Sequence, residues 1–387
     1  MTQATTPSES PSVDVARRRI PGVDVPASLL CFGNFTFGAT WWSNASDDEA
    51  VAIQNQAVER GVNFFDTAPA YGNGRAEALL ARTIQDVGRD DLVVSTKFGY
   101  DLKRDPGEEG SHRERKQDFS AAAIRGECEN SLRVLGVERI DLYQAHNLKL
   151  GHCSDELFET LEALIAEGKI AAWGAALGPA IGWREEGRLS LARGAATVQT
   201  VYNLYEQDPG RELVEMAAGE HAIDHAHVPE AVRPAEAKPR PGAGVLARVP
   251  TNSGILDDEF DSPRHQFPPS DHRKFRDRNW LVYGLKKNDI VRPMAADLGL
   301  SLRQFAFKWL AGQPHVLSIE PNLICLDDVN DFAAAADAKP LPGDVLAELD
   351  RMYPVDFDLG DGAHPCDIKS SVAEGGAERS GGGAPRG

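Results

Sequence analysis

The chain carries a carboxylate, a phenol, an amine and an imidazole near the ends of three successive apolar segments: Asp66, Tyr71, Lys97 and His146. The segments are rich in β-branched and aromatic residues, which is typical of buried strands, and the first runs into a turn rich in glycine. A carboxylate at the end of a buried strand is costly to desolvate without a partner. We therefore expect Lys97, one strand over, to pair with Asp66.

Together these groups suit the protonation of an oxygen atom. The ordinary pKa of tyrosine is near 10, about three units too high for ready proton exchange at neutral pH, and a neighbouring ammonium is expected to lower it. Asp66 would hold Lys97 charged, and His146 would donate a hydrogen bond to a substrate oxygen. Singly, each residue has a structural explanation, as an interior ion pair, a rim phenol or a core histidine. Their joint occurrence favours a site that protonates an alkoxide as a hydride reaches a carbonyl carbon.

Eight apolar, β-rich segments could position this site, and helical patterns separate them. The segments are 29–35, 62–68, 92–99, 140–146, 170–177, 197–204, 244–250 and 316–323. Strands alternating with helices predict parallel pairing and an α/β fold, and eight units predict a (β/α)8 TIM barrel. An open doubly wound sheet would normally show G-x-G-x-x-G after its first strand. The stretch CFGNFTFGA lacks that pattern, so the barrel is preferred.

The pattern predicts one barrel domain over residues 18–353, between a disordered tail at 1–17 and a flexible tail at 354–387. Three connections are unusually long for compact α/β units. We expect the loops at 99–119 and 256–278 to rim the catalytic face, because they follow strands. The loop at 219–243 follows a helix and is expected at the opposite end.

The composition excludes several classes of function. The 387-residue chain has a formal net charge of −18 and a pI of about 5.0, which argues against nucleic-acid or anionic-membrane binding. No apolar run is long enough for a bilayer, and the N-terminus lacks the apolar region of a secretory signal. Five scattered cysteines without C-x-x-C spacing predict reduced thiols and a cytoplasmic protein.

Several motifs closely resemble those of the aldo-keto reductase superfamily. GVNFFDTAPAYGNGRAEALL (61–80) resembles its opening signature, VVSTKFG its lysine motif and IDLYQAHN its histidine motif. The later strands IAAWGAALG, VQTVYNL and GVLARVPTNSGIL follow in the family's order. The resemblance covers roughly residues 18–353. It implies a barrel, an extended nicotinamide cofactor at the carboxyl ends of the strands, and the four residues above as a tetrad with Tyr71 as general acid.

The chain also departs from that family, and it looks like a divergent branch. Many members have Ser-Asn after the fifth strand to hold the nicotinamide carboxamide, where this sequence has Ala176 and Leu177. Gln199, another expected amide partner, is retained. Arg248, at the end of the seventh strand, is interpreted as a contact for the cofactor pyrophosphate or ring, with a surface ion pair as the alternative.

The segment after the eighth strand bears on the choice between NAD and NADP. The family often has Pro-Gly and then a base for the 2′-phosphate of NADP, where this chain has Asn322 after the proline. It offers Asp327, Asp328 and Asp331 instead. Carboxylates repel a phosphate but accept hydrogen bonds from a ribose 2′-hydroxyl, so NAD is predicted over NADP. A base from another loop, such as Arg248 or the 264–278 segment, would weaken this prediction.

Two other features have both a functional and a structural interpretation. Trp41 and Trp42 follow the first strand and would either line a substrate pocket or cover the barrel mouth. His221 and His225 in HAIDHAH are one helical turn apart, as zinc ligands can be. That stretch lacks the glutamate of H-E-x-x-H and adjoins a proline-rich loop, so a solvated loop is favoured and no metal is expected.

The sequence therefore predicts an NAD(P)-dependent oxidoreductase that interconverts a small carbonyl compound and an alcohol. A non-catalytic nucleotide-sensing or interaction protein on the same barrel is one alternative. A redox-neutral isomerase or lyase using Tyr71 as acid–base is another. The substrate and the oligomeric state are left open, because substrate choice depends on the long loops.

Overall fold

Eight parallel strands form the barrel of the computed structural model, which describes residues 15–38, 43–105, 114–178, 183–220, 230–233, 238–269, 271–337 and 339–360. The strands pair in chain order: β3 (Cys31–Gly33), β4 (Phe64–Asp66), β5 (Val93–Phe98), β6 (Ile140–His146), β7 (Ile170–Ala176), β8 (Thr197–Val201), β9 (Gly244–Arg248) and β10 (Val316–Glu320). A parallel bridge between Leu30 and Ile319 joins the last strand to the segment before the first. The predicted (β/α)8 TIM barrel is confirmed.

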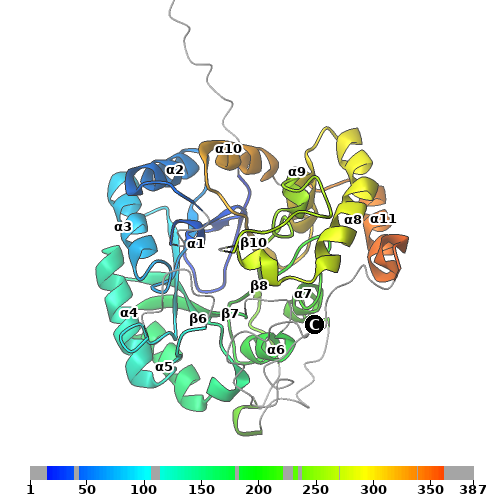
Figure 1. Ribbon diagram of the computed structural model, residues 1–387. Coiled ribbons are helices and arrows are strands. Elements are labelled where there is room, and N and C mark those ends of the chain that lie inside the picture. The colour runs from blue at the N-terminus through cyan, green and yellow to red at the C-terminus, as the bar shows by residue number, and fades with distance from the viewer. Residues whose placement is uncertain are drawn as a thin grey trace, which may run out of the picture.

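Helices surround the strands (Figure 1). They are α1 (Phe35–Gly38), α2 (Asp47–Glu59), α3 (Arg75–Val87), α4 (Ala121–Leu135), α5 (Asp155–Ala166), α6 (Arg184–Ala192), α7 (Gly210–Ala217), α8 (Arg278–Asp297), α9 (Leu302–Ala311), α10 (Leu326–Ala335) and α11 (Gly343–Met352). Local signals explain several boundaries. Ser46 and Glu49 form a capping box at the start of α2. Ser120 caps α4, and Gly136 ends it in the left-handed conformation.

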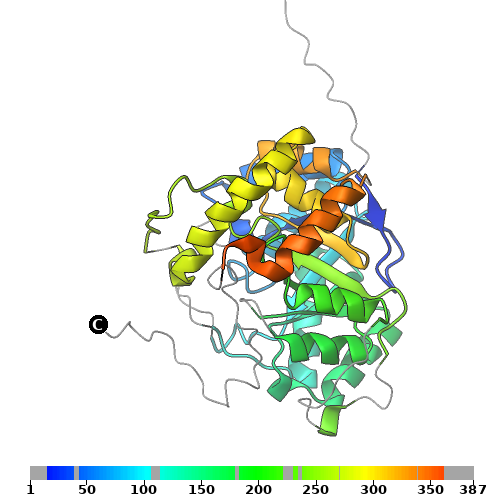
Figure 2. The ribbon, with the colours of Figure 1, turned by 90° about the vertical axis from the view of Figure 1, so that its right-hand side faces the viewer.

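One end of the barrel is closed by a small antiparallel hairpin, β1 (Arg17–Arg18) and β2 (Ala27–Ser28) (Figure 2, dark blue). Its turn residues Ile20 and Val23 belong to the same apolar cluster as Phe64 and Val93, which lie at the amino ends of β4 and β5. The hairpin therefore seals the amino-terminal end of the barrel. The polar strand ends gather at the opposite mouth, where barrel enzymes place their active sites.

The packed structure extends beyond the expected domain limits at both ends. Val15 is buried, and the Ala16 N–H donates to the Ala336 carbonyl at 2.8 Å. At the other end, α11 continues into a 3-10 helix (Tyr353–Asp358), where Phe357 is buried against Tyr205. Val355, Phe357 and Leu359 alternate with aspartates, a spacing typical of a strand, whereas the chain forms an irregular 3-10 helix here. Among the residues described, no helix is both long and apolar enough to cross a bilayer.

Candidate active site

Lys97 and Asp66 form a buried ion pair at the carboxyl ends of β5 and β4, as expected from the sequence. The Lys97 ammonium donates to Asp66 Oδ2 and to the Thr67 carbonyl, the latter at 2.9 Å. The other carboxylate oxygen, Oδ1, accepts from Ser95 Oγ and from Gln144 Nε2, each at 2.8 Å. Burial lowers the pKa of Lys97, but Asp66, Tyr71 and Glu320 together raise it more, so the net pKa lies above the ordinary value. The ammonium is therefore fixed and charged.

Tyr71 lies in the turn after β4, close to this pair. The Lys97 ammonium is 4.9 Å from the centroid of the Tyr71 ring. Gly38, at the end of α1, allows the approach, because a Cβ there would clash with Tyr71. Burial raises the pKa of Tyr71, and the Lys97 charge opposes that rise without cancelling it. The expected net lowering of this pKa was therefore wrong: desolvation outweighs the ammonium, and the phenol is protonated at neutral pH.

His146 ends β6 and lies between two phenols. Its ring makes edge contacts with Tyr71, at a centroid distance of 5.6 Å, and with Tyr100, at 4.9 Å. Gln117 Nε2 donates to the His146 carbonyl at 2.9 Å, so the loop after β5 borders the mouth. Burial lowers the pKa of His146 well below its ordinary value, and the charges of Lys97 and Arg248 add to this effect. The imidazole is therefore neutral and suited to hydrogen bonding with an oxygen.

Tyr100 is a member of this cluster that the sequence analysis missed. Its hydroxyl accepts from Asn147 Nδ2 at 2.7 Å and donates to Glu114 at 3.3 Å. Burial raises the pKa of Tyr100, so this phenol is also protonated at neutral pH. Its position directly after the strand that carries Lys97 is the sequence signal that would have identified it.

Glu320 is a second residue that the sequence analysis missed. It ends β10 and accepts from Gln199 Nε2, on β8, at 2.9 Å. Gly33, on β3, makes room for it, because a Cβ there would clash with the Glu320 carboxyl group. Burial and the Asp66 charge raise the pKa of Glu320 to about 8, although Lys97 opposes them. Asp66 was identified because polar residues at the carboxyl ends of barrel strands are candidate site residues. The same reasoning applies to Glu320.

Arg248 ends β9, and its guanidinium reaches the segment directly after β7, the fifth strand of the barrel. The resemblance to aldo-keto reductases would lead us to expect Ser-Asn in this segment. Nη2 donates to the Leu177 carbonyl at 3.2 Å and to the Gly178 carbonyl. Nε is buried and has no hydrogen-bond acceptor within the described parts of the chain. Ala176 and Leu177 are themselves buried. A buried donor without an acceptor at the carboxyl ends of barrel strands fits an anionic or carbonyl group of a nucleotide cofactor.

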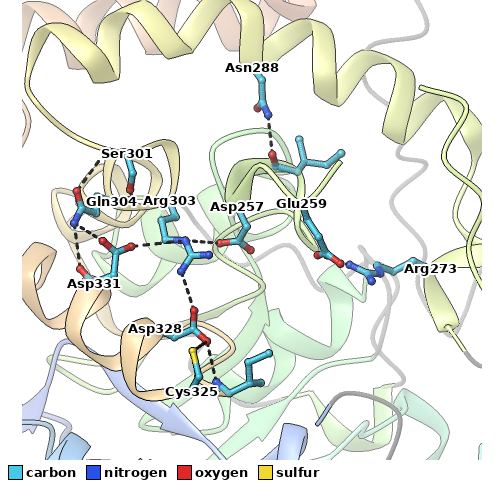
Figure 3. A network of polar contacts seen from close by, with 12 residues as sticks. Asp257, Glu259, Arg273, Asn288, Ser301, Arg303, Gln304, Cys325, Asp328 and Asp331 are labelled. Carbon is cyan, nitrogen blue, oxygen red and sulfur yellow. Dashed lines mark hydrogen bonds and ion pairs between the residues drawn. The ribbon is translucent and has the colours of Figure 1, made fainter. Parts of the chain in front are cut away.

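The residues after β10 lie in a network centred on Arg303 of α9 (Figure 3). Arg303 pairs with Asp257 at 3.1 Å, with Asp328 at 2.9 Å and with Asp331 at 3.7 Å. Gln304 Nε2 also donates to Asp331 Oδ1, at 2.7 Å. The segment after β10 has no basic residue of its own, but Arg303 of α9 places a guanidinium beside it. Three carboxylates surround this one guanidinium, so it is not a bare cation.

Asn322 and Asp327 are both exposed in the segment that follows β10. Trp41 and Trp42, like His221 and His225, lie outside the described residues. Within the described ranges, no group of three or more histidine, cysteine or acidic side chains is placed to hold a metal ion.

The strands form a parallel barrel, and an acid, a phenol, an amine and an imidazole lie together at one mouth of it. This arrangement is typical of TIM-barrel enzymes. The sequence pattern of the Aldo/keto reductase family matches residues 29–354. The chain therefore belongs to this family and is an aldo-keto reductase-type oxidoreductase.

Three known proteins illustrate the relationship. A "Probable voltage-gated potassium channel subunit beta" of Oryza sativa subsp. japonica is 26% identical over 326 residues, which cover 81% of this chain and 90% of that protein. The structure of glycerol dehydrogenase AKR11B4 from Gluconobacter oxydans is 25% identical, with a TM-score of 0.70, and the match covers 93% of this chain and 99% of that one. An aldo/keto reductase from Klebsiella pneumoniae, solved in complex with NADP and acetate, is 26% identical, with a TM-score of 0.56 over 85% of this chain and 92% of that one.

Proposed function

We propose that the protein is an NAD(P)-dependent reductase of small carbonyl compounds, with Tyr71 as its general acid. The observation that carries this proposal is the position of a protonated phenol beside both a buried ammonium and a neutral imidazole. The Klebsiella relative was solved with NADP, which supports a nicotinamide cofactor here. The buried Arg248 Nε without an acceptor is consistent with such a ligand.

The bound nicotinamide would supply a hydride, which forms the new C–H bond at the carbonyl carbon. The π electron pair of the carbonyl moves to its oxygen, and that oxygen takes the proton of the Tyr71 hydroxyl. The Lys97 ammonium stabilises the phenolate left on Tyr71, which then regains a proton from solvent. Because an alkoxide is much more basic than a phenolate, Tyr71 can donate even with its raised pKa.

Gln199, Arg248, Asn322, Asp327 and Asp331 are proposed to contact the cofactor, and Trp41 and Trp42 the substrate. The acidic surroundings of Arg303 support the proposed preference for NAD. Three carboxylates would repel a phosphate on the adenosine ribose more strongly than one guanidinium attracts it. The neutral ribose 2′-hydroxyl of NAD carries no such penalty.

A nucleotide-binding interaction subunit is a second candidate, favoured by the relationship to a probable potassium channel subunit. One experiment separates the candidates: absorbance and fluorescence of NADH and NADPH are followed with the purified protein and a panel of aldehydes, ketones and hydroxycarbonyls. Oxidation of the nucleotide with stoichiometric alcohol formation supports the reductase. Nucleotide binding without turnover supports the interaction subunit. Conversion of a substrate without any nucleotide refutes both and supports an isomerase or lyase.

A further inference from the structure

Glu320 is a half-buried residue at the mouth whose carboxyl group the reaction above does not use. Its Oε2 accepts from Gln199 Nε2 at 2.9 Å, and the missing side chain of Gly33 leaves space for the rest of the carboxyl group. Glu320 and Arg248 are register partners on adjacent strands, so their side chains start on the same side of the sheet. The group therefore lies among the strand ends that form the candidate site.

The other charged groups around Glu320 are an ion pair and a guanidinium. The Lys97 ammonium on β5 and the Asp66 carboxylate on β4 form an ion pair and together contribute no net charge. The Arg248 guanidinium contributes one positive charge from β9. Burial raises the pKa of the Cys31 thiol on β3 and of the Tyr71 phenol, so both are neutral. Among these groups, Glu320 is thus the one that changes its charge between about pH 7 and pH 9.

The direction of this change follows from the surroundings. Burial and Asp66 raise the pKa of Glu320 to about 8, and the positive charges of Lys97 and Arg248 oppose them. Below that pH the carboxyl group is neutral and adds no charge to the mouth. Above it, a carboxylate appears in an interior where charges interact more strongly than in water.

We propose that Glu320 makes the site discriminate between the oxidised and the reduced nicotinamide ring by charge. This inference rests on the proposed function, because it requires a nicotinamide nucleotide at the mouth. The oxidised ring is positively charged and the reduced ring is neutral, so a carboxylate favours only the former. The ring must reach the carbonyl carbon whose oxygen Tyr71 protonates, which brings it to the mouth that Glu320 borders. The reduced nucleotide is therefore favoured at low pH, and the oxidised nucleotide gains affinity as Glu320 ionises.

The test is a set of equilibrium titrations of the purified protein with NAD⁺ and with NADH, at pH 6.5 and pH 9.5, by calorimetry. For the wild type, we expect the affinity for NAD⁺ relative to NADH to rise roughly tenfold between the two pH values. Glu320→Gln keeps the size and an acceptor oxygen but cannot ionise, so its ratio should stay constant. Repeating the titrations with NADP⁺ and NADPH covers the other nucleotide pair.

Glu127→Gln is the matched control. Burial also raises the pKa of Glu127 to about 8, but this residue accepts from the Gly99 N–H on the α4 side of β5, away from Glu320. Its variant should retain the full pH dependence of the wild-type ratio. Two results would overturn this inference but leave the proposed function intact. One is a wild-type protein that binds both nucleotides with the same ratio of NAD⁺ to NADH affinity at both pH values. The other is a Glu320→Gln variant whose ratio changes with pH as much as that of the wild type. Failure of the wild type to bind any nicotinamide nucleotide would overturn the proposed function and the inference together.

Discussion

The Lys97 ammonium and the Asp66 carboxylate are paired inside the barrel with exposed side-chain fractions of only 1% and 0%. Asp66 also accepts two hydrogen bonds through its other oxygen, so its charge is compensated from several directions. Buried pairs of this kind contribute little net stability when intact, because desolvation of both ions offsets their attraction. Loss of one partner is different, since it leaves an uncompensated charge in the interior.

We therefore expect Lys97→Met to lower the free energy of unfolding by about 3–5 kcal/mol. Turnover should also fall by roughly a hundredfold or more, because the Tyr71 phenolate loses its stabilising charge. Urea unfolding followed by circular dichroism measures the first effect. The control is Lys97→Met combined with Asp66→Asn, which removes both charges and should regain part of the lost stability. A double variant no more stable than Lys97→Met would contradict the buried-pair argument.

Tyr71→Phe keeps the ring and its contact with His146 but removes the proton donor. The expected result is a loss of roughly a hundredfold or more in kcat, with the Kd for the nucleotide within a few-fold of wild type. Steady-state kinetics and a nucleotide titration measure these quantities. Tyr143→Phe is the control, because the Tyr143 hydroxyl is buried and donates to the Ile124 carbonyl, outside the mouth. Turnover of Tyr71→Phe within a few-fold of wild type would refute its role as the acid.

Much of this architecture could be predicted because it depends on local pattern and on one topological rule. Apolar β-rich segments alternating with helices require a parallel sheet, and parallel strands bring their carboxyl ends to one face. That rule alone predicts that Asp66, Lys97 and His146 lie together. The same rule applies to Glu320, which ends β10.

The features that sequence did not reveal depend on tertiary packing. The pKa of Tyr71 rises because the fold buries the phenol, and the extent of burial cannot be obtained from a neighbouring lysine in the sequence. Arg303 belongs to α9, yet it pairs with Asp257 after β9 and with Asp328 in α10. No linear spacing joins these three residues. The charge balance around Arg303 therefore becomes visible only in the folded chain.

Glu127 gives a prediction about stability and pH. Burial raises the pKa of this carboxyl group to about 8, from an ordinary value of about 4.3. Between these values the folded protein binds more protons than the unfolded chain, so this group makes stability fall as pH rises. Glu127→Gln cannot ionise, and its stability should decline less than that of the wild type between pH 5 and pH 8. Urea midpoints across this range provide the measurement, and parallel declines in the two proteins would be inconsistent with a raised pKa.

Asp328 tests the proposed preference for NAD through the charge balance around Arg303. Asp328→Asn removes one of three carboxylates at this guanidinium but retains an oxygen that can accept from the Ile324 N–H. With less competing negative charge, Arg303 should attract a ribose 2′-phosphate more strongly. We expect the affinity for NADPH relative to NADH to rise by roughly three- to tenfold, measured by parallel fluorescence titrations.

The control for this experiment is Asp90→Asn, which makes the same change in net charge in the exposed turn before β5, at the amino-terminal end of the barrel. It should leave the ratio of the two affinities unchanged, because the mobile ions of the buffer screen charges beyond about 10 Å at 0.1 M salt. A wild-type protein that binds NADPH more tightly than NADH would refute the NAD preference itself. An unchanged ratio in Asp328→Asn, with NADH still preferred, would show that the Arg303 network does not determine that preference.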